Sequence, residues 1–508
     1  MCCREIGERV LNDRIKKIMT WRPDKKLVAA GAILGLILLL LPLFRVALYS
    51  APWYDDYNYG RFAKEFLEEE RSLVSAIRGA WYCTRTSWYA WQGTFSSIFF
   101  MSMVPSVWGD QYYFWGPLFL LCILLIAIFV LTKILLRDVL GAEWSFCLAV
   151  QAIVAAMVFE FIYTPNGGFF WYNAGVHYVG MHSFLLLLTA AWIKLLKGTG
   201  KVSRVLLLLW TLMGAVLAGG ANFVTTLQGL LVGLSLVALG ILLKNKRTFL
   251  MLPSVAVYLA AFWKNVSAPG NAVRKNVLGD MGMDPAEAIG HSFLEAFRHI
   301  PEFTGLITVA VMILLLPIVW QMGKKLTFQF RFPGLLLLWS FCLYATGFTP
   351  SLYSLGHAGL GRTMNAVKIT FQLLLIINEV YWLGWIQKKL RDRDKFFDRG
   401  AIWWFYPIMG ALMLCIFAVE PHQSAKYSSF AAYYYVHTGE AYNFHQEYLN
   451  RLETIVNGGS DVVVTPYVYR PWILQSSDLS SSPEGEANRA MAAWYHKNSI
   501  TCIAQDSE

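Results

Sequence analysis

Two adjacent carboxylates, Asp55 and Asp56, stand shortly after the first long apolar run of the chain, residues 27–49. Aromatic residues flank them in the order Trp53-Tyr-Asp-Asp-Tyr57. Charged groups are costly beside hydrocarbon, and those found there are usually functional. Two carboxylates this close cannot both ionise freely, so one can hold its proton to higher pH and serve as a base near neutral pH. Such a base could deprotonate an acceptor hydroxyl that attacks the anomeric carbon of a sugar.

The acidic pair has other interpretations. Carboxylate oxygens also suit a divalent metal such as Mg²⁺ or Mn²⁺, which could be held by both Asp55 and Asp56. The pair could instead be an acidic turn, because Asp is a good N-cap for a following helix. The surrounding aromatic rings suit the membrane interface, and their flat apolar faces and polar edges also suit a pyranose ring. Their position at a membrane exit favours a functional site.

Two predicted outer loops carry the cations that a phosphate leaving group would need. They read Pro269-Gly-Asn-Ala-Val-Arg274 and Gly356-His-Ala-Gly-Leu-Gly-Arg362. Arginine binds phosphate through a planar fork, and glycines let backbone N–H groups approach a ligand. The alternative is that these are ordinary basic residues that anchor the chain at the interface.

A third loop, residues 169–173 together with His177, is rich in aromatic residues and could form a second wall of a sugar pocket. Such aromatics also occur as interface belt residues. The predicted catalytic residues are Asp55 and Asp56. The predicted substrate-binding residues are Trp53, Tyr57, Trp91, Trp171, Asn173, His177, Asn271, Arg274, His357 and Arg362.

The elements that must position these residues are membrane helices. The chain has 508 residues, of which 56% are hydrophobic and only 15% are charged, whereas soluble globular chains are closer to about 25% charged. Apolar runs of about 20 residues recur along it, each long enough to cross a bilayer of about 30 Å. We expect an all-α polytopic membrane protein with about eleven transmembrane helices.

The net charge of +10 gathers in short loops on one side of the predicted membrane, as the positive-inside rule requires. This distribution excludes nucleic acid as a partner, because no long basic arm interleaved with aromatics is present. It predicts an integral plasma (inner) membrane protein with a cytoplasmic N-terminus and an extracytoplasmic C-terminus, whose partners include membrane lipids.

Three regions follow from this topology. Residues 1–26 form a basic cytoplasmic leader, and residues 27–419 form the transmembrane domain with a long first outer loop at 50–111. Residues 420–508 turn polar and predict a small extracytoplasmic α/β appendage, with helices near 439–456 and 486–496 and a strand at 461–465. We expect this appendage to be non-catalytic.

An acidic motif soon after the first span, in a long first outer loop of a chain with many spans, resembles the GT-C superfamily of membrane glycosyltransferases. The resemblance implies a polyprenyl-phosphate sugar donor, with Asp55 and Asp56 as base or metal-site residues. The chain also resembles a group of bacterial multi-pass membrane proteins of undefined function. That second likeness rests on Trp53-Tyr-Asp-Asp-Tyr57, Trp91-Gln-Gly93, Trp171-Tyr-Asn-Ala-Gly175, Pro269-Gly-Asn-Ala-Val-Arg274, Asn488-Arg489 and Trp494-Tyr495.

These observations predict an inverting glycosyltransferase that transfers a sugar to an envelope glycan or lipid acceptor on the outer face of the membrane. Arg274 and Arg362 would hold the phosphate of the donor. A transporter or flippase for an envelope polysaccharide or lipid-linked glycan is the alternative, with the carboxylates binding an ion or proton. A non-catalytic partner in envelope assembly is a third possibility. The low density of charge within the spans disfavours transport.

Overall fold

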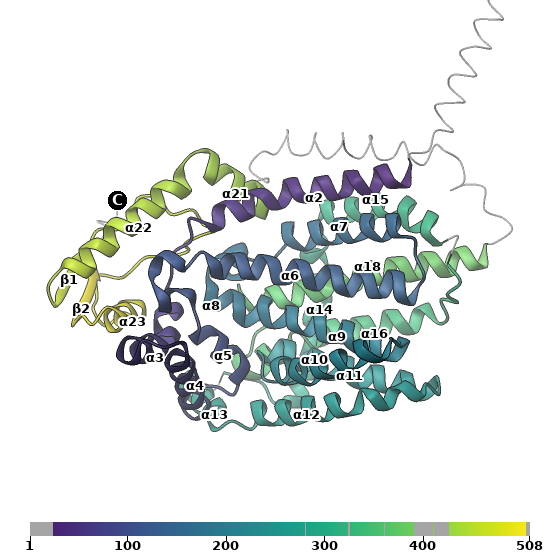
Figure 1. Ribbon diagram of the computed structural model, residues 1–508, viewed down its shortest axis with the longest axis horizontal. Helices are drawn as coiled ribbons and strands as arrows, with labels where there is room; N and C mark the ends of the chain where they lie inside the picture. Colours follow the sequence, from purple (N-terminus) through teal and green to yellow (C-terminus); the bar gives the residue numbers. More distant parts are fainter. Residues whose placement is uncertain are drawn as a thin grey trace, which may run out of the picture.

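Long apolar helices make up most of the computed structural model, which describes residues 24–279, 281–323, 326–359, 361–390, 410 and 426–503. In chain order, the helices before the C-terminal region are α2 (Lys25–Ala47), α3 (Asp55–Glu70), α4 (Leu73–Ala90), α5 (Phe95–Ser102), α6 (Trp115–Lys133), α7 (Trp144–Glu160), α8 (Tyr172–Gly175), α9 (Met181–Lys197), α10 (Lys201–Gly219), α11 (Phe223–Leu242), α12 (Leu252–Val266), α13 (Pro269–Val277), α14 (Pro285–Phe303), α15 (Leu306–Gly323), α16 (Pro333–Ala345), α17 (Thr349–Leu355) and α18 (Thr363–Lys389). Figure 1 shows most of the long helices running side by side, with α3, α4 and α13 gathered at one end.

Eight helical stretches within the described residues are long and apolar enough to cross a membrane. This result confirms an all-α, multi-pass membrane protein. The eight stretches are Lys25–Ala47, Asp110–Val139, Tyr172–Lys197, Lys201–Gly219, Phe223–Leu242, Leu306–Gly323, Pro333–Leu355 and Thr363–Lys389.

The predicted count of eleven spans is not reached among these residues. The eleven apolar runs of the sequence include residues 143–163 and 248–263, which correspond to α7 and α12, with only 17 and 15 residues. A 17-residue helix is about 25 Å long, short of a hydrocarbon core of about 30 Å. The predicted span 401–419 and the leader 1–26 lie almost entirely outside the described residues. The count of eleven therefore stays a prediction.

Several long helices expose apolar stripes that suit contact with lipid. On α2 the side chains of Leu34, Leu38 and Leu41 are more than half exposed, and on α10 those of Val205 and Leu209 are too. Spacings of three and four residues place such side chains on one helical face. A continuous apolar face is unfavourable in water but suits a hydrocarbon phase. These faces thus mark the sides of the bundle that meet lipid.

The C-terminal region contains the predicted strand and both predicted helices. Its elements are α21 (Ser428–His437), α22 (Glu440–Asn457), β1 (Asp461–Val464), α23 (Glu486–Trp494) and β2 (Ser499–Cys502). The two strands pair in parallel, with Asp461 opposite Ser499, and α23 lies in the connection between them. α21 packs against α2, and α23 packs against α3, so this region covers the end of the bundle where α3 lies (Figure 1).

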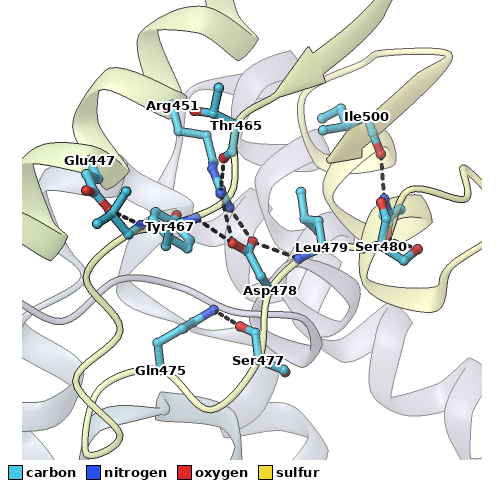
Figure 2. A network of polar contacts seen from close by, with 12 residues as sticks. Glu447, Arg451, Thr465, Tyr467, Gln475, Ser477, Asp478, Leu479, Ser480 and Ile500 are labelled. Atoms are coloured by element: carbon cyan, nitrogen blue, oxygen red, sulfur yellow. Dashed lines mark hydrogen bonds and ion pairs between the residues drawn. The ribbon is translucent and has the colours of Figure 1, made fainter. Parts of the chain in front are cut away.

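A buried ion pair holds the interior of this region together, as Figure 2 shows. The Arg451 guanidinium donates to both carboxylate oxygens of Asp478, at 2.7 and 3.1 Å, and to the Thr465 carbonyl at 2.5 Å. The backbone N–H groups of Tyr467 and Leu479 also donate to Asp478. Burial alone would raise the pKa of Asp478, but the Arg451 guanidinium and these donors outweigh it and hold the pKa below its ordinary value. The network ties α22 to the chain that leads to α23.

Replacing Asp478 with Asn should destabilise this region, because it leaves the Arg451 charge buried without a carboxylate. The side chains are only 5% and 10% exposed, and breaking a buried pair costs about 3–5 kcal/mol. Hydrogen–deuterium exchange of the whole protein in nanodiscs should show faster exchange across residues 461–480. Since the pKa of Asp478 is lowered on folding, the wild-type stabilisation is complete above the unfolded pKa of about 3.9 and is lost as the pH falls below it.

Glu484→Gln is the matched control, because Glu484 pairs with Arg489 across 3.3 Å with both side chains more than half exposed. An exposed pair contributes at most about 1 kcal/mol. Equal exchange in both variants would contradict a stabilising role for Asp478.

Candidate active site at the start of α3

The acidic pair occupies the first turn of α3. Tyr54 is the N-cap residue and has a positive φ of 34°, a conformation that costs a non-glycine residue energy and often marks a functional site. Asp55 and Asp56 follow directly, so both carboxylates lie near the positive end of the helix dipole. Neither acid caps the helix in the ordinary sense, because the N-cap position belongs to Tyr54. The structural alternative of an Asp N-cap is therefore wrong for this helix.

Asp56 is fully buried and surrounded by donors. One of its oxygens accepts from the backbone N–H and side-chain amide of Asn173, at 2.9 and 2.7 Å. The other accepts from the Tyr113 hydroxyl at 2.8 Å and the Trp53 backbone N–H at 2.9 Å. Burial raises the pKa of Asp56 to about 6 although these donors oppose the rise, and four donors on its two oxygens suit the ionised carboxylate. Its acceptor positions are occupied, and Asp56 joins three separate segments.

Asp55 has a different environment. One oxygen accepts from the Arg362 guanidinium at 2.9 Å, and the two side chains are 12% and 38% exposed. The Arg362 guanidinium also lies over the Trp171 ring, 4.5 Å from its centroid. Burial raises the pKa of Asp55; Arg362 opposes this, the negative charge of Glu486 adds to it, and Arg274 opposes it weakly. A carboxylate, a guanidinium and an aromatic face thus meet at the start of α3.

The second predicted arginine lies in a neighbouring contact. Arg274 on α13 donates to the Gln92 side chain and lies 5.5 Å from the centroid of the Trp91 ring. The Asn271 side chain accepts from the Gly93 backbone N–H at 2.9 Å. Two stretches that were prominent in the sequence, 91–93 and 269–274, therefore pack on each other, and Arg274 is held where its charge reaches Asp55.

Some of the predicted aromatic residues pack between helices, and others lie near Arg362. Trp53 and Tyr57 are buried, and Tyr57 contacts Trp494 edge to face at 5.5 Å, so this ring joins α3 to α23. The buried His177 ring lies against Tyr178 at 4.6 Å. The Tyr178 hydroxyl accepts a hydrogen bond from the Thr363 hydroxyl at 3.0 Å. Thr363 directly follows Arg362 in the chain, so this contact brings His177 and Tyr178 near the arginine.

His357 is set apart from the other predicted substrate-binding residues. Its side chain is exposed, and its Nδ1 accepts from the Gly359 N–H at 3.1 Å. It lines an open pocket of about 590 Å³ together with residues of α14 such as His291 and Arg298. None of the other predicted substrate-binding residues lines that pocket, so His357 is not grouped with Asp55 there.

Sequence reasoning missed Glu486. The Tyr54 hydroxyl donates to the Glu486 carboxylate, which brings a residue of the C-terminal region to the start of α3. Because that region was expected to be non-catalytic, an acidic residue at the start of a predicted helix there carried no signal. The nearest indication was the stretch beginning at Asn488, two residues further on.

The arrangement does not fit a divalent metal at the acidic pair. Both oxygens of Asp56 face hydrogen-bond donors, and Asp55 faces a guanidinium. Among the residues that the structure describes, no group of three or more His, Cys, Asp or Glu side chains could hold a metal ion. A cation would have to displace these donors before it could bind.

The geometry separates two neighbouring carboxylates, one enclosed by donors and one paired with a partly exposed arginine. No protein-family model, curated protein or solved structure matches the chain. The assignment of chemistry therefore rests on this geometry, above all on Asp55 and Arg362.

The two acids should respond differently to substitution. Asp56→Asn should lower the free energy of unfolding by about 3 kcal/mol or more, because hydrogen bonds to a buried charge contribute about 1.5–3 kcal/mol each and an amide cannot accept from all four donors. Asp55 accepts one hydrogen bond from a charged partner, which contributes about 1.5–3 kcal/mol, and asparagine keeps an oxygen for Arg362, so Asp55→Asn should cost less than that. Thermal unfolding of both variants in the same detergent, followed by tryptophan fluorescence, measures the difference. Equal losses in the free energy of unfolding would contradict this difference and show that both carboxylates stabilise the fold to the same extent.

Proposed function

We propose that this protein is a GT-C-type inverting glycosyltransferase of the plasma membrane. It would transfer a sugar from a polyprenyl-phosphate donor to an envelope glycan or lipid acceptor on the outer face. The observation that carries the proposal is the contact between Asp55 and Arg362, which joins a potential base to a potential phosphate ligand across 307 residues of sequence.

The distribution of basic loops supports an outward orientation for this site. Basic residues flank the turn between α9 and α10 and the turn after α11, namely Lys197, Lys201, Arg204, Lys244 and Lys246. The α10–α11 turn lies at the opposite end of these helices. There the Gly220 carbonyl accepts from Ser96 and the Gly219 carbonyl from Asn265, in the segments next to α4 and α13. By the positive-inside rule, the end that carries Asp55 faces outward.

The phosphate of a donor would compete with Asp55 for Arg362. Arginine forms strong paired hydrogen bonds with phosphate, and Arg362 is exposed enough to be reached. Once Arg362 turns to the phosphate, Asp55 loses its nearest counter-charge, and burial then favours its protonated form more strongly. Donor binding would in this way make Asp55 a better proton acceptor.

The reaction is a single displacement at the anomeric carbon. The acceptor hydroxyl gives its proton to Asp55, and its oxygen forms a bond to the anomeric carbon from the face opposite the phosphate. The bond from that carbon to the phosphate oxygen breaks, and its electron pair leaves with the polyprenyl phosphate. The charge that develops on the leaving group is stabilised by Arg362, with Arg274 as the second cation of the site. The anomeric configuration is inverted.

The proposal is tested with purified protein in nanodiscs and a panel of radiolabelled polyprenyl-phosphate sugars. Asp55→Asn should lower transfer or slow hydrolysis of the accepted donor by about 100-fold or more, because a general base contributes about 10²–10⁴ in rate. Arg362→Gln should raise the KM for the donor, since it removes the cation that meets the phosphate.

Asp284→Asn is the control, because Asp284 is an exposed acid with no side-chain capping bond; its activity should stay within about twofold of wild type. Turnover that survives Asp55→Asn in a folded protein would contradict the proposal. Movement of a labelled lipid-linked glycan across vesicles, without sugar release, would favour a flippase.

A further inference from the structure

The start of α23 brings a second carboxylate into contact with Tyr54, the residue that precedes Asp55. Glu486 is the first residue of α23, and its carboxylate accepts from the Tyr54 hydroxyl. Tyr54 directly precedes Asp55 in the chain, and the charge of Glu486 acts on Asp55, where it adds to the rise in pKa caused chiefly by burial. The Glu486 side chain is exposed, so it is open to a ligand that approaches from outside.

Buried contacts hold α23 in this place. Trp494 is 1% exposed and packs against Tyr57, while its carbonyl accepts from the Lys64 side chain at 2.7 Å. The Tyr495 hydroxyl donates to Asp110 at 3.0 Å. These contacts join α23 to α3 and to the start of the second span, so the C-terminal region is docked on the site and not loosely attached beside it.

The start of α23 is fixed from its other side as well. The side-chain amide of the buried Asn488 donates to the Ser480 and Ile500 carbonyls, both at 2.8 Å; Ser480 and Ile500 appear in Figure 2. Asn488 therefore has a structural task, whereas Glu486, half a turn earlier, faces solvent. A rigidly mounted and exposed carboxylate is the kind of group that orients a bound ligand.

The side chains of Tyr54, Asp55 and Glu486 together suit a carbohydrate ligand. A carboxylate accepts charge-assisted hydrogen bonds from sugar hydroxyls, and the Tyr54 ring offers an apolar face with a polar tip. The carboxylates of Asp55 and Glu486 are balanced by the guanidinium groups of Arg362 and Arg274, so these four groups carry no net charge that would select a charged sugar. A neutral glycoside is therefore the better match.

We propose that Glu486 binds the acceptor, accepting hydrogen bonds from the hydroxyls of a neutral glycoside and turning one hydroxyl toward Asp55. Tyr54 holds the Glu486 carboxylate in place. That the bound glycoside is an acceptor rests on the proposed function. Glycoside binding at Glu486 is nevertheless measurable without any sugar donor. It makes the C-terminal region part of the site.

Saturation-transfer difference NMR on the whole protein in nanodiscs tests this inference, with the methyl glycosides of glucose, galactose, mannose and N-acetylglucosamine as probes. Wild type should give signals on the ring protons of at least one glycoside, and Glu486→Gln should weaken that binding about tenfold. Glu484→Gln, two residues away and exposed, should leave binding unchanged. Binding in Glu486→Gln equal to wild type, or no signal from any glycoside with wild type, would overturn the inference.

Tyr54→Phe distinguishes ligand binding from a purely structural latch. It removes the hydroxyl that contacts Glu486 but leaves the carboxylate, so we expect a loss of binding of at most about threefold. Equal losses in Tyr54→Phe and Glu486→Gln would overturn direct binding by Glu486. A different result would contradict the proposed function alone. In that case no donor would release its sugar, while glycoside binding would still depend on Glu486.

Discussion

The arrangement of the helices around the candidate site depends on one constraint, the free-energy cost of burying the negative charge of Asp56. An ionised carboxylate without water is tolerated only where donors replace its hydration. Asp56 has four such donors, and they come from the start of α3, from Tyr113 before α6 and from Asn173 on α8. These segments must converge for the charge to be stable, and their convergence in turn fixes the direction in which Asp55 points. The buried Asp56 thus sets the position of Asp55, which is also buried and contacts the partly exposed Arg362.

Much of the architecture could be predicted because hydrophobic length is a local property. A run of apolar residues long enough to span hydrocarbon is visible in the sequence itself, and eight described helices meet that criterion. Prediction was weaker for α7 and α12, whose runs are short and depend on neighbouring helices for burial. The strand β1 and the helices α22 and α23 were also visible, since a run of β-branched residues and amphipathic spacing can be recognised within a few residues.

The site was only partly predictable, because its contacts are long-range. The sequence singled out Asp55 and Arg362 separately, for their residue types and their outer loops, but pairing across 307 residues is decided by how the helices pack. It grouped His357 with Arg362 because they are close in the chain, whereas the structure has His357 lining a different pocket. It passed over Glu486, since nothing local distinguishes an acid at the start of a surface helix from one that reaches a site.

Helical geometry explains why two adjacent acids serve different ends. Successive residues of an α-helix point about 100° apart, so Asp55 and Asp56 in the first turn of α3 cannot both face the same small ligand. The Asp56 side chain turns inward to the donors of the bundle, and the Asp55 side chain turns to Arg362. In this helix one acid is a buried anchor and the other contacts Arg362. The direct partner of Asp55 is therefore Arg362 at the start of α18, far along the chain, and not the acid at the next position.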